Sequence, residues 1–355
     1  MTPGIAGRGL WGRVWKTGSR RACHRAVTVN ALPAPVPGNQ EFVRLGLCCG
    51  FVDADIKFRT STLTYCKKLP REKRLTYLSS LVLHNSQSLL KALEECHEHS
   101  IGCFRVNSSF CPLITHADVG YRMDDLPDFE EISRNLATCR VLKDDQNLRL
   151  AMHPDQFVVL NSPKEEIVAN SVAELEYHAM IGEAIGVDVI NIHGGGVYGD
   201  KKSALDRFAK NFDRLSPGMQ SKLTLENDDR SFTPTDLLPL CKKIGVPMVY
   251  DVHHHRCNHD GVPIPTMTEQ AIESWNREPL FHISSPATGW EGGNPRPHHN
   301  LINPCDYPDC WENLKGVTVE VEAKLKDRAV KKLMKQLSDR KVGLWKTNAQ
   351  LQCVG

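Results

Sequence analysis

The sequence contains no apolar run of the roughly 18 residues that a membrane-spanning helix needs, and its 355 residues carry a net charge of only +2. No membrane partner is therefore expected, and a nucleic-acid surface would have to be a local basic patch. The thirteen cysteines are scattered, without a CxxC pair. This spacing argues against a zinc ribbon or a secreted disulfide framework, so we expect reduced and mostly buried thiols.

Acidic residues are missing from the first 40 positions, which contain several arginines and the proline-rich run ALPAPVPG. Such composition is typical of organelle transit peptides, although a disordered extension has the same composition. We predict that 1–40 is an extension of this kind, that 41–340 forms one catalytic domain and that 341–355 is a C-terminal tail. A bacterial-type cytoplasm is the expected location, with organellar targeting by 1–40 left open.

Short β-branched runs alternate with longer helical patterns from residue 41 onward. Eight strands are predicted, over 42–47, 101–106, 148–152, 187–192, 222–226, 246–252, 279–284 and 317–322. Helical patterns cover 72–99, 127–142, 163–185, 202–214, 234–243 and 326–339. This alternation predicts a single-domain α/β fold, the (β/α)8 TIM barrel. An open doubly wound sheet is the alternative, but no GxGxxG follows the first strand, so no nucleotide cofactor is expected.

Most of the predicted strands end in a histidine or a carboxylate. The side chains at the ends of strands three to eight are His153, His193, Glu226, Asp251 with the following His254, His282 and Glu322, and the loop after strand two carries His116. The carboxyl ends of barrel strands meet on one rim, so these groups should lie together. Side-chain alternation puts Glu226 on the face of Thr224, and Glu320 on that of Glu322, pointing into the barrel. Buried polar groups need partners, which a metal would supply.

Histidine and carboxylate ligands without thiolate favour divalent zinc, manganese or iron. The candidate ligands are too many for one ion, so the sequence predicts a site with two or three ions. Clustered ions activate water and stabilise charge in phosphoester hydrolysis, so metal-assisted phosphodiester cleavage is the predicted chemistry. Glu226, Asp251 and Glu322 are the candidate catalytic carboxylates, and Glu226 is expected to bridge ions rather than to carry protons.

One local cluster of positive charge, CKKLPREKR at 66–74, follows the first predicted strand near the same rim. Its residues Lys67, Lys68 and Arg71 are candidate contacts to DNA phosphates. A solvated start of a helix explains the same charges equally well.

The ordered motifs of this chain resemble those of the UV damage endonuclease family, from about Leu45 to Leu337. They are FRVNSSFCPLITH, MHPDQF, NIHGGG, LENDD, YDVHHHRCN, HISSP and VEVEAKLK. The resemblance implies a barrel similar to endonuclease IV that acts as a DNA repair endonuclease, nicking damaged double-stranded DNA 5′ to ultraviolet photoproducts and other distorting lesions. It implies two or three divalent ions, with Mn first and Zn, Mg or Co as alternatives, and a protein that acts as a monomer.

The implied metal ligands are His116, His153, His193, Glu226, Asp251, His254, His282, His298 and Glu322. Asn300 stands where the family usually has an acid, so the choice of His298 over His299 stays open. Leu280 stands where some members carry a lysine modified to a carbamate that meets the metals, which puts metal count and lesion range in question.

The segment HPDQF also matches the family, which implies that Gln156 and Phe157 enter the duplex at a lesion. A planar side chain can replace the stacking that is lost when damaged bases leave the helix. Burial of Phe157 in the core is the competing interpretation.

Three other functions compete with a damage-specific endonuclease. An abasic-site endonuclease would need no wedge residues, and a sugar isomerase or epimerase would need fewer ligands. A metal-dependent binding module would not need ligands from seven strands or their loops.

Overall fold

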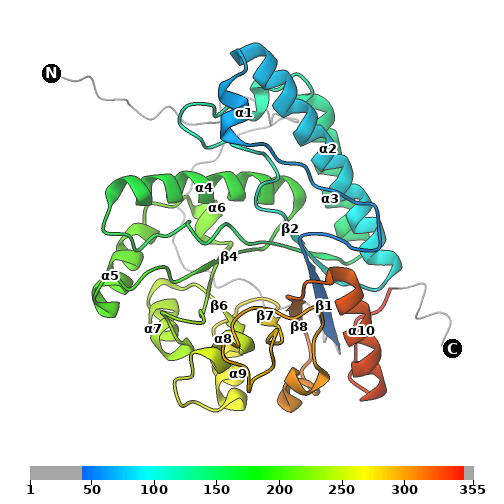
Figure 1. The fold of residues 1–355 in the computed structure, drawn as a ribbon, viewed down its shortest axis with the longest axis vertical. Coiled ribbons are helices and arrows are strands. Elements are labelled where there is room, and N and C mark those ends of the chain that lie inside the picture. Colours follow the sequence, from blue (N-terminus) through cyan, green and yellow to red (C-terminus); the bar gives the residue numbers. More distant parts are fainter. Residues whose placement is uncertain (1–41, 348–355) are drawn as a thin grey trace, which may run out of the picture.

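The computed structural model describes residues 42–347, which form a closed parallel barrel of eight strands with helices around it (Figure 1). The strands follow one another in chain order, and β8 closes the barrel against β1. The predicted TIM barrel is therefore confirmed. The predicted N-terminal extension, 1–40, lies outside the described residues, as does the part of the predicted tail after residue 347.

The eight strands lie where the alternation of the sequence predicts them. They are β1 Val43–Cys48, β2 Cys103–Val106, β3 Arg149–Met152, β4 Val189–His193, β5 Leu223–Glu226, β6 Met248–Asp251, β7 Leu280–Ile283 and β8 Val317–Val321. All are buried along their length except the last residue of β4, because one face meets the helices and the other meets the barrel interior.

The six predicted helical patterns correspond to the longer helices of the barrel, and one further long helix, α9, was missed. These helices are α2 Arg71–Glu98, α3 Phe129–Asp145, α4 Glu165–Ile185, α5 Lys201–Phe212, α7 Pro234–Ile244, α9 Ile264–Glu273 and α10 Lys326–Asp339. Shorter helical segments are α1 Leu63–Lys67, α6 Pro217–Gln220, α8 Val252–Cys257, η1 Met123–Asp125, η2 Pro304–Asp306 and η3 Asp309–Trp311.

Side chains that point into the barrel form three levels along its axis. At the N-terminal end of the strands, Arg149 Nη1 donates to Thr318 Oγ1 (3.0 Å) and Arg44 Nε donates to Glu278 Oε1 (3.0 Å). The next level is an apolar cluster of Ala151, Val189, Val249 and Leu280. Above it, at the C-terminal ends of the strands, lie the histidines and carboxylates. The apolar level separates two polar networks. The histidines and carboxylates of the upper network therefore need partners at the C-terminal end of the barrel.

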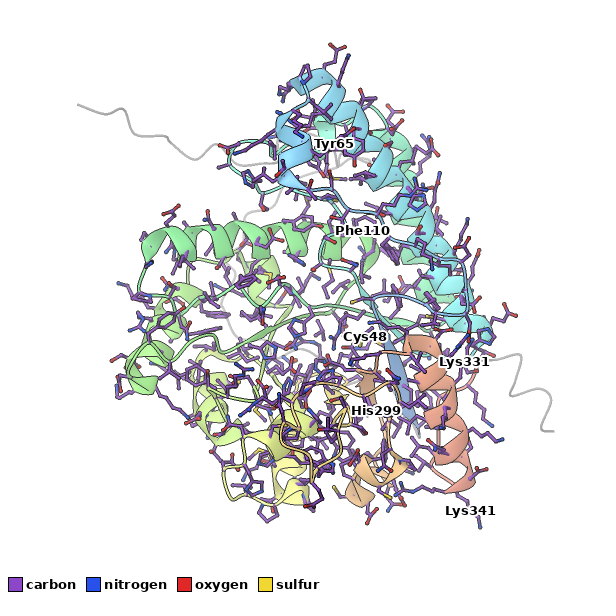
Figure 2. The ribbon with its side chains drawn as sticks, viewed as in Figure 1. Cys48, Tyr65, Phe110, His299, Lys331 and Lys341 are labelled. Atoms are coloured by element: carbon purple, nitrogen blue, oxygen red, sulfur yellow. The ribbon has the colours of Figure 1, made fainter. Side chains whose placement is uncertain are left out.

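Residues 49–70, which include α1, form an arm with the first turns of α2. This arm stands apart from the strands at the top of Figure 1. Asn85 of α2 anchors it, accepting the Arg59 N–H (2.7 Å) and donating to the Phe110 carbonyl (2.9 Å). Figure 2 labels Tyr65 in this arm and Cys48 at the end of β1, with Phe110 between them in this view. Because the arm follows the carboxyl end of β1, it belongs to the rim that carries the candidate site.

The described part of the predicted tail packs on the barrel. Leu344 forms a parallel bridge with Val43 of β1, and Trp345 is buried. The cysteines within 42–347 are all free, and most of them are buried, as expected. Among these residues, no helix is both long and apolar enough to cross a membrane.

Candidate metal centre

Glu226, the last residue of β5, is the centre of the polar level. Its side chain is buried, and Asn191 of the neighbouring strand donates a hydrogen bond to Oε2 (2.5 Å). The same oxygen lies 3.0 Å from His153 Nε2 and 3.9 Å from His193 Nε2. One carboxylate oxygen therefore faces two imidazoles from β4 and the loop after β3.

The other oxygen of Glu226 faces the opposite side of the barrel. Oε1 lies 3.3 Å from His254 Nδ1 and 3.0 Å from His282 Nδ1. A carboxylate whose two oxygens face different histidine pairs has the arrangement of a bridging ligand. The bridging role expected for Glu226 stays a prediction, which this geometry favours.

Asp251 is held so that one of its oxygens, Oδ2, makes no hydrogen bond within 42–347 and lies near His254 Nδ1 (3.5 Å) and His282 Nδ1 (4.0 Å). Its backbone N–H donates to Asn227 Oδ1 (3.0 Å), and its carbonyl accepts from Asn227 Nδ2 (2.9 Å). Oδ1 accepts the His254 N–H (2.7 Å) and caps α8, whereas the buried Oδ2 has no hydrogen-bond partner within the described residues. A buried carboxylate oxygen without a hydrogen bond is costly unless a cation binds it.

The potential metal ligands form three overlapping groups, and within each group the ligand atoms lie within 4.8 Å of one another. They are His153–His193–Glu226, Glu226–Asp251–His254 and Asp251–His282–Glu322. Seven of the nine predicted metal ligands belong to these groups. Since adjacent groups share Glu226 or Asp251, the donors form a continuous set in which ions could share carboxylates.

The charges of the centre keep Glu226 ionised. Burial raises the pKa of Glu226, but His282 and His193 outweigh it and hold the pKa well below its usual range. Burial lowers the pKa of His282, but Glu226 outweighs it and raises that pKa to about 10. For His193 burial prevails and the pKa is lowered. Ionised carboxylates in a dry site require a bound cation, which is either a proton on histidine or a metal.

The two remaining predicted ligands lie at the edge of the centre. His298 Nδ1 is 3.7 Å from Glu322 Oε2, whereas His299 Nδ1 accepts the Leu301 N–H (3.1 Å) and its side chain is more exposed. The structure thus brings His298, rather than His299, to the carboxylates. His116 lines the cavity above the centre, which is described next. Its Nδ1 accepts the Asp118 N–H (3.1 Å), and it belongs to none of the three ligand groups.

A cavity of 1120 Å³ opens above the centre, with His193 and His254 in its wall. Gln156 and Phe157, on the loop after β3, also line it, and 77% of Phe157 is exposed. Asp155 Oδ1 accepts the Phe157 N–H (3.0 Å), which fixes the tip of this loop. Burial of Phe157 in the core is therefore wrong.

The basic cluster lies on the arm beside the loop that carries His116, but two of its charges already have partners. Lys67 Nζ is 2.6 Å from Asp118 Oδ2, and Arg71 Nη2 is 3.3 Å from Asp125 Oδ2. Lys68 is exposed. These acids reduce the positive field of the cluster, so it is weaker than the sequence suggests.

Two residues of the centre were not assigned from the sequence. Arg105 of β2 donates to Glu320 Oε2 (2.7 Å, from Nε) and to Glu322 Oε1 (2.6 Å, from Nη1), and all three are on the interior face. The signal for Arg105 was a lone charge in the apolar run IGCFRV. Tyr198, on the loop after β4, lines the cavity and is 48% exposed, which no local pattern indicated.

Leu280 lies in the apolar level directly below the centre. It is fully buried and packs with Ala151, Val189 and Val249. The leucine therefore fills space where the resemblance implies a lysine, and the guanidinium that lies beside His282 belongs to Arg105.

The buried Asp251 Oδ2, which makes no hydrogen bond in the described part of the chain, and the donor set of imidazoles and carboxylates fit divalent metal ions. The model describing the UV-endonuclease UvdE family matches residues 43–348. A UV DNA damage endonuclease of Bacillus velezensis is 35% identical over 300 residues, which cover 78% of this chain and 88% of the relative. One from Bacillus cereus strain G9842 is 33% identical over 288 residues, 79% of this chain and 89% of the relative.

Solved structures agree with this match. The crystal structure of SacUVDE has a TM-score of 0.74 at 28% identity and covers 84% of this chain and 99% of its own. Endonuclease IV from Thermus thermophilus, with a TM-score of 0.54 at 14% identity over 83% of this chain and 98% of its own, shares the fold. Because the family match spans nearly all described residues, the protein belongs to the UV-endonuclease UvdE family.

Proposed function

We propose that the protein is a metal-dependent DNA repair endonuclease that nicks duplex DNA 5′ to ultraviolet photoproducts and other distorting lesions. The observation that carries this proposal is the buried Asp251 Oδ2, which has no hydrogen bond among the described residues, within a donor set centred on Glu226 whose members His193 and His254 line an open cavity. Membership in the UV-endonuclease family and the named activity of the Bacillus relatives support the choice of DNA as substrate.

The residues that would hold two or three divalent ions are those of the three overlapping groups, with His298 and His116 as outer ligands. When bound, divalent ions lower the pKa of water and neutralise charge that builds on a phosphate, and manganese is the proposed native ion. Glu226 would serve two ions at once, because its oxygens face opposite histidine pairs. Asn191 keeps Glu226 in place by donating to Oε2.

Recognition of damage is proposed for the loop after β3. Phe157 stands exposed at its tip with Gln156 beside it, and a flat ring at this position can stack where damaged bases have left the helix. A damaged step is cheaper to open than an intact one, which favours the lesion over normal DNA. Lys68 would hold DNA phosphates near the rim. Lys67 and Arg71 would do the same once phosphates replace their acidic partners, Asp118 and Asp125.

A plasmid-nicking assay with the purified full chain tests the proposal. Untreated, ultraviolet-irradiated and depurinated supercoiled plasmids are incubated with manganese or with a chelator. The expected result is manganese-dependent relaxation of irradiated plasmid that spares the untreated one. Cleavage of depurinated plasmid alone would replace the proposal with an abasic-site endonuclease, and no cleavage with any divalent metal would overturn it. We further propose a monomer in the cytoplasm, which sedimentation and cell fractionation would test.

A further inference from the structure

The imidazole of His282 presents its two nitrogens to two different sets of groups. Nδ1 faces the candidate metal site, at 3.0 Å from Glu226 Oε1 and 3.5 Å from Glu322 Oε1. Nε2 lies on the far side, 3.1 Å from Glu320 Oε2. A histidine that binds a metal through one nitrogen carries its proton on the other, where a partner normally accepts it.

Glu320 is built to accept that proton. It is on β8, two residues before Glu322, and its side chain is buried inside the barrel. Its Oε2 accepts from Arg105 Nε (2.7 Å) and lies 3.1 Å from His282 Nε2, so the carboxylate offers acceptor oxygens to both side chains. On the Nε2 side of His282, the polar contacts are made by the protein side chains Glu320 and Arg105.

Arg105 fixes Glu320 in this position. Its Nε donates to Glu320 Oε2 (2.7 Å), and its Nη2 is paired with the same carboxylate. Nη2 is also 2.8 Å from His282 Nε2, but arginine only donates. Nη2 has two N–H groups, so one can point to Glu320 and the other to Nε2. When a divalent ion takes the Nδ1 lone pair, Nε2 has to carry the ring proton, and Glu320 Oε2 at 3.1 Å is then its acceptor.

We propose that Glu320 is a positioning residue that holds the Nε2 proton of His282, so that Nδ1 presents its lone pair to a divalent ion. Arg105 holds Glu320 and, through Nη1, one oxygen of Glu322 at 2.6 Å. The inference rests on the proposed metal site and adds the groups that orient it. In this inference the Glu320–Arg105 pair orients His282 and Glu322, whereas the ligands themselves bind the ion.

Metal titration of the full chain tests the inference. Manganese affinity is measured for the wild type and for Glu320→Gln, in which Arg105 loses its charged partner and the new amide can also donate toward Nε2. The expected loss of affinity is about 10- to 100-fold. Glu278→Gln is the matched control, because Glu278 is a largely buried carboxylate that binds Arg44 at the opposite end of the barrel. It should leave manganese affinity unchanged, and Glu320→Asp, which keeps the carboxylate, should bind more tightly than Glu320→Gln.

A spectroscopic measurement keeps the inference testable if Glu320→Gln fails to fold. Nitrogen NMR of zinc-loaded wild-type protein with labelled histidine, assigned with His282→Asn, reports which ring nitrogen carries the proton. The expected state is a protonated Nε2 and a metal-bound Nδ1. A metal-bound Nε2, or unchanged affinity in Glu320→Gln, would overturn the inference. A wild-type chain that binds no divalent metal would instead overturn the proposed function.

Discussion

Phe157 and Tyr198 line the same cavity from two successive loops, after β3 and β4, and are its exposed aromatic side chains. Arg207 lies 5.7 Å from the Tyr198 ring, which orients the tyrosine, whereas 77% of Phe157 is exposed. The phenylalanine is therefore the ring that is free to enter a duplex.

Phe157→Ala should lower discrimination between irradiated and untreated duplex while leaving manganese affinity unchanged. Stacking of a base on an aromatic side chain contributes about 1–3 kcal/mol, so discrimination should fall roughly 5- to 150-fold. Competition binding with both DNAs measures it. Val141→Ala, at another exposed apolar residue (58%) on α3, is the control and should match the wild type. Unchanged discrimination in Phe157→Ala would remove the wedge role.

Asp251→Asn should abolish nicking and lower the metal content while damaged DNA still binds. The substitution replaces the oxygen without a hydrogen bond, in a fully buried carboxylate, with an amide nitrogen that cannot bind a cation. Elemental analysis of purified protein gives the metal content. Asp327→Asn is the control, since Asp327 is equally buried but accepts the Val52 N–H (2.7 Å) outside the metal groups. It should lose about 1–3 kcal/mol of stability and keep its metal. Full activity of Asp251→Asn would refute the metal assignment.

His298→Ala and His299→Ala form a natural matched pair. His298 Nδ1 lies 3.7 Å from Glu322 Oε2, while the imidazole of His299 contacts the backbone of Leu301. We expect manganese affinity to fall about 10- to 100-fold in the first variant and to stay at the wild-type value in the second. The reverse order would move the ligand to His299.

The buried His178 of α4 should make stability depend on pH. Its Nδ1 donates to the Glu174 carbonyl (2.8 Å), and burial lowers its pKa from 6.5 to about 4. Between these values the unfolded chain binds a proton that the folded chain does not. The free energy of unfolding therefore falls as pH decreases through this window, by about 3 kcal/mol.

Urea unfolding with a chelator present, from about pH 7 to about pH 4.5, measures this loss. His178→Asn keeps a donor for the Glu174 carbonyl but does not titrate, so its stability should decrease less across the window. Equal slopes for both proteins would mean that other groups cause the acid sensitivity.

Alternation alone located the barrel strands, because an interior residue is followed by one that faces the helices. It failed at the end of β6, where the predicted strand continued to residue 252. Asp251 caps α8 instead, so His254 reaches the site from the first turn of a helix. The capping tendency of aspartate is readable in a sequence, but the point at which a strand stops pairing depends on its neighbours.

Contacts between distant segments were beyond prediction. Lys67 and Asp118 are separated by about 50 positions, as are Arg71 and Asp125, and no local pattern relates them. Arg105 and Glu320 meet only because β8 lies next to β1 in the closed barrel. Sequence periodicity indicates which face a residue takes, whereas the partner across the barrel follows from the register of all strands.

The closing strand, β8, carries Glu320 and leads directly into Glu322, and it is the last of the eight to be synthesised. A chain still emerging from the ribosome therefore lacks the final carboxylate of the centre and the partner of Arg105. Premature termination before residue 317 would leave fragments without a complete set of ligands. The order of the strands thus means that the complete set of candidate ligands exists only after the last strand has been made.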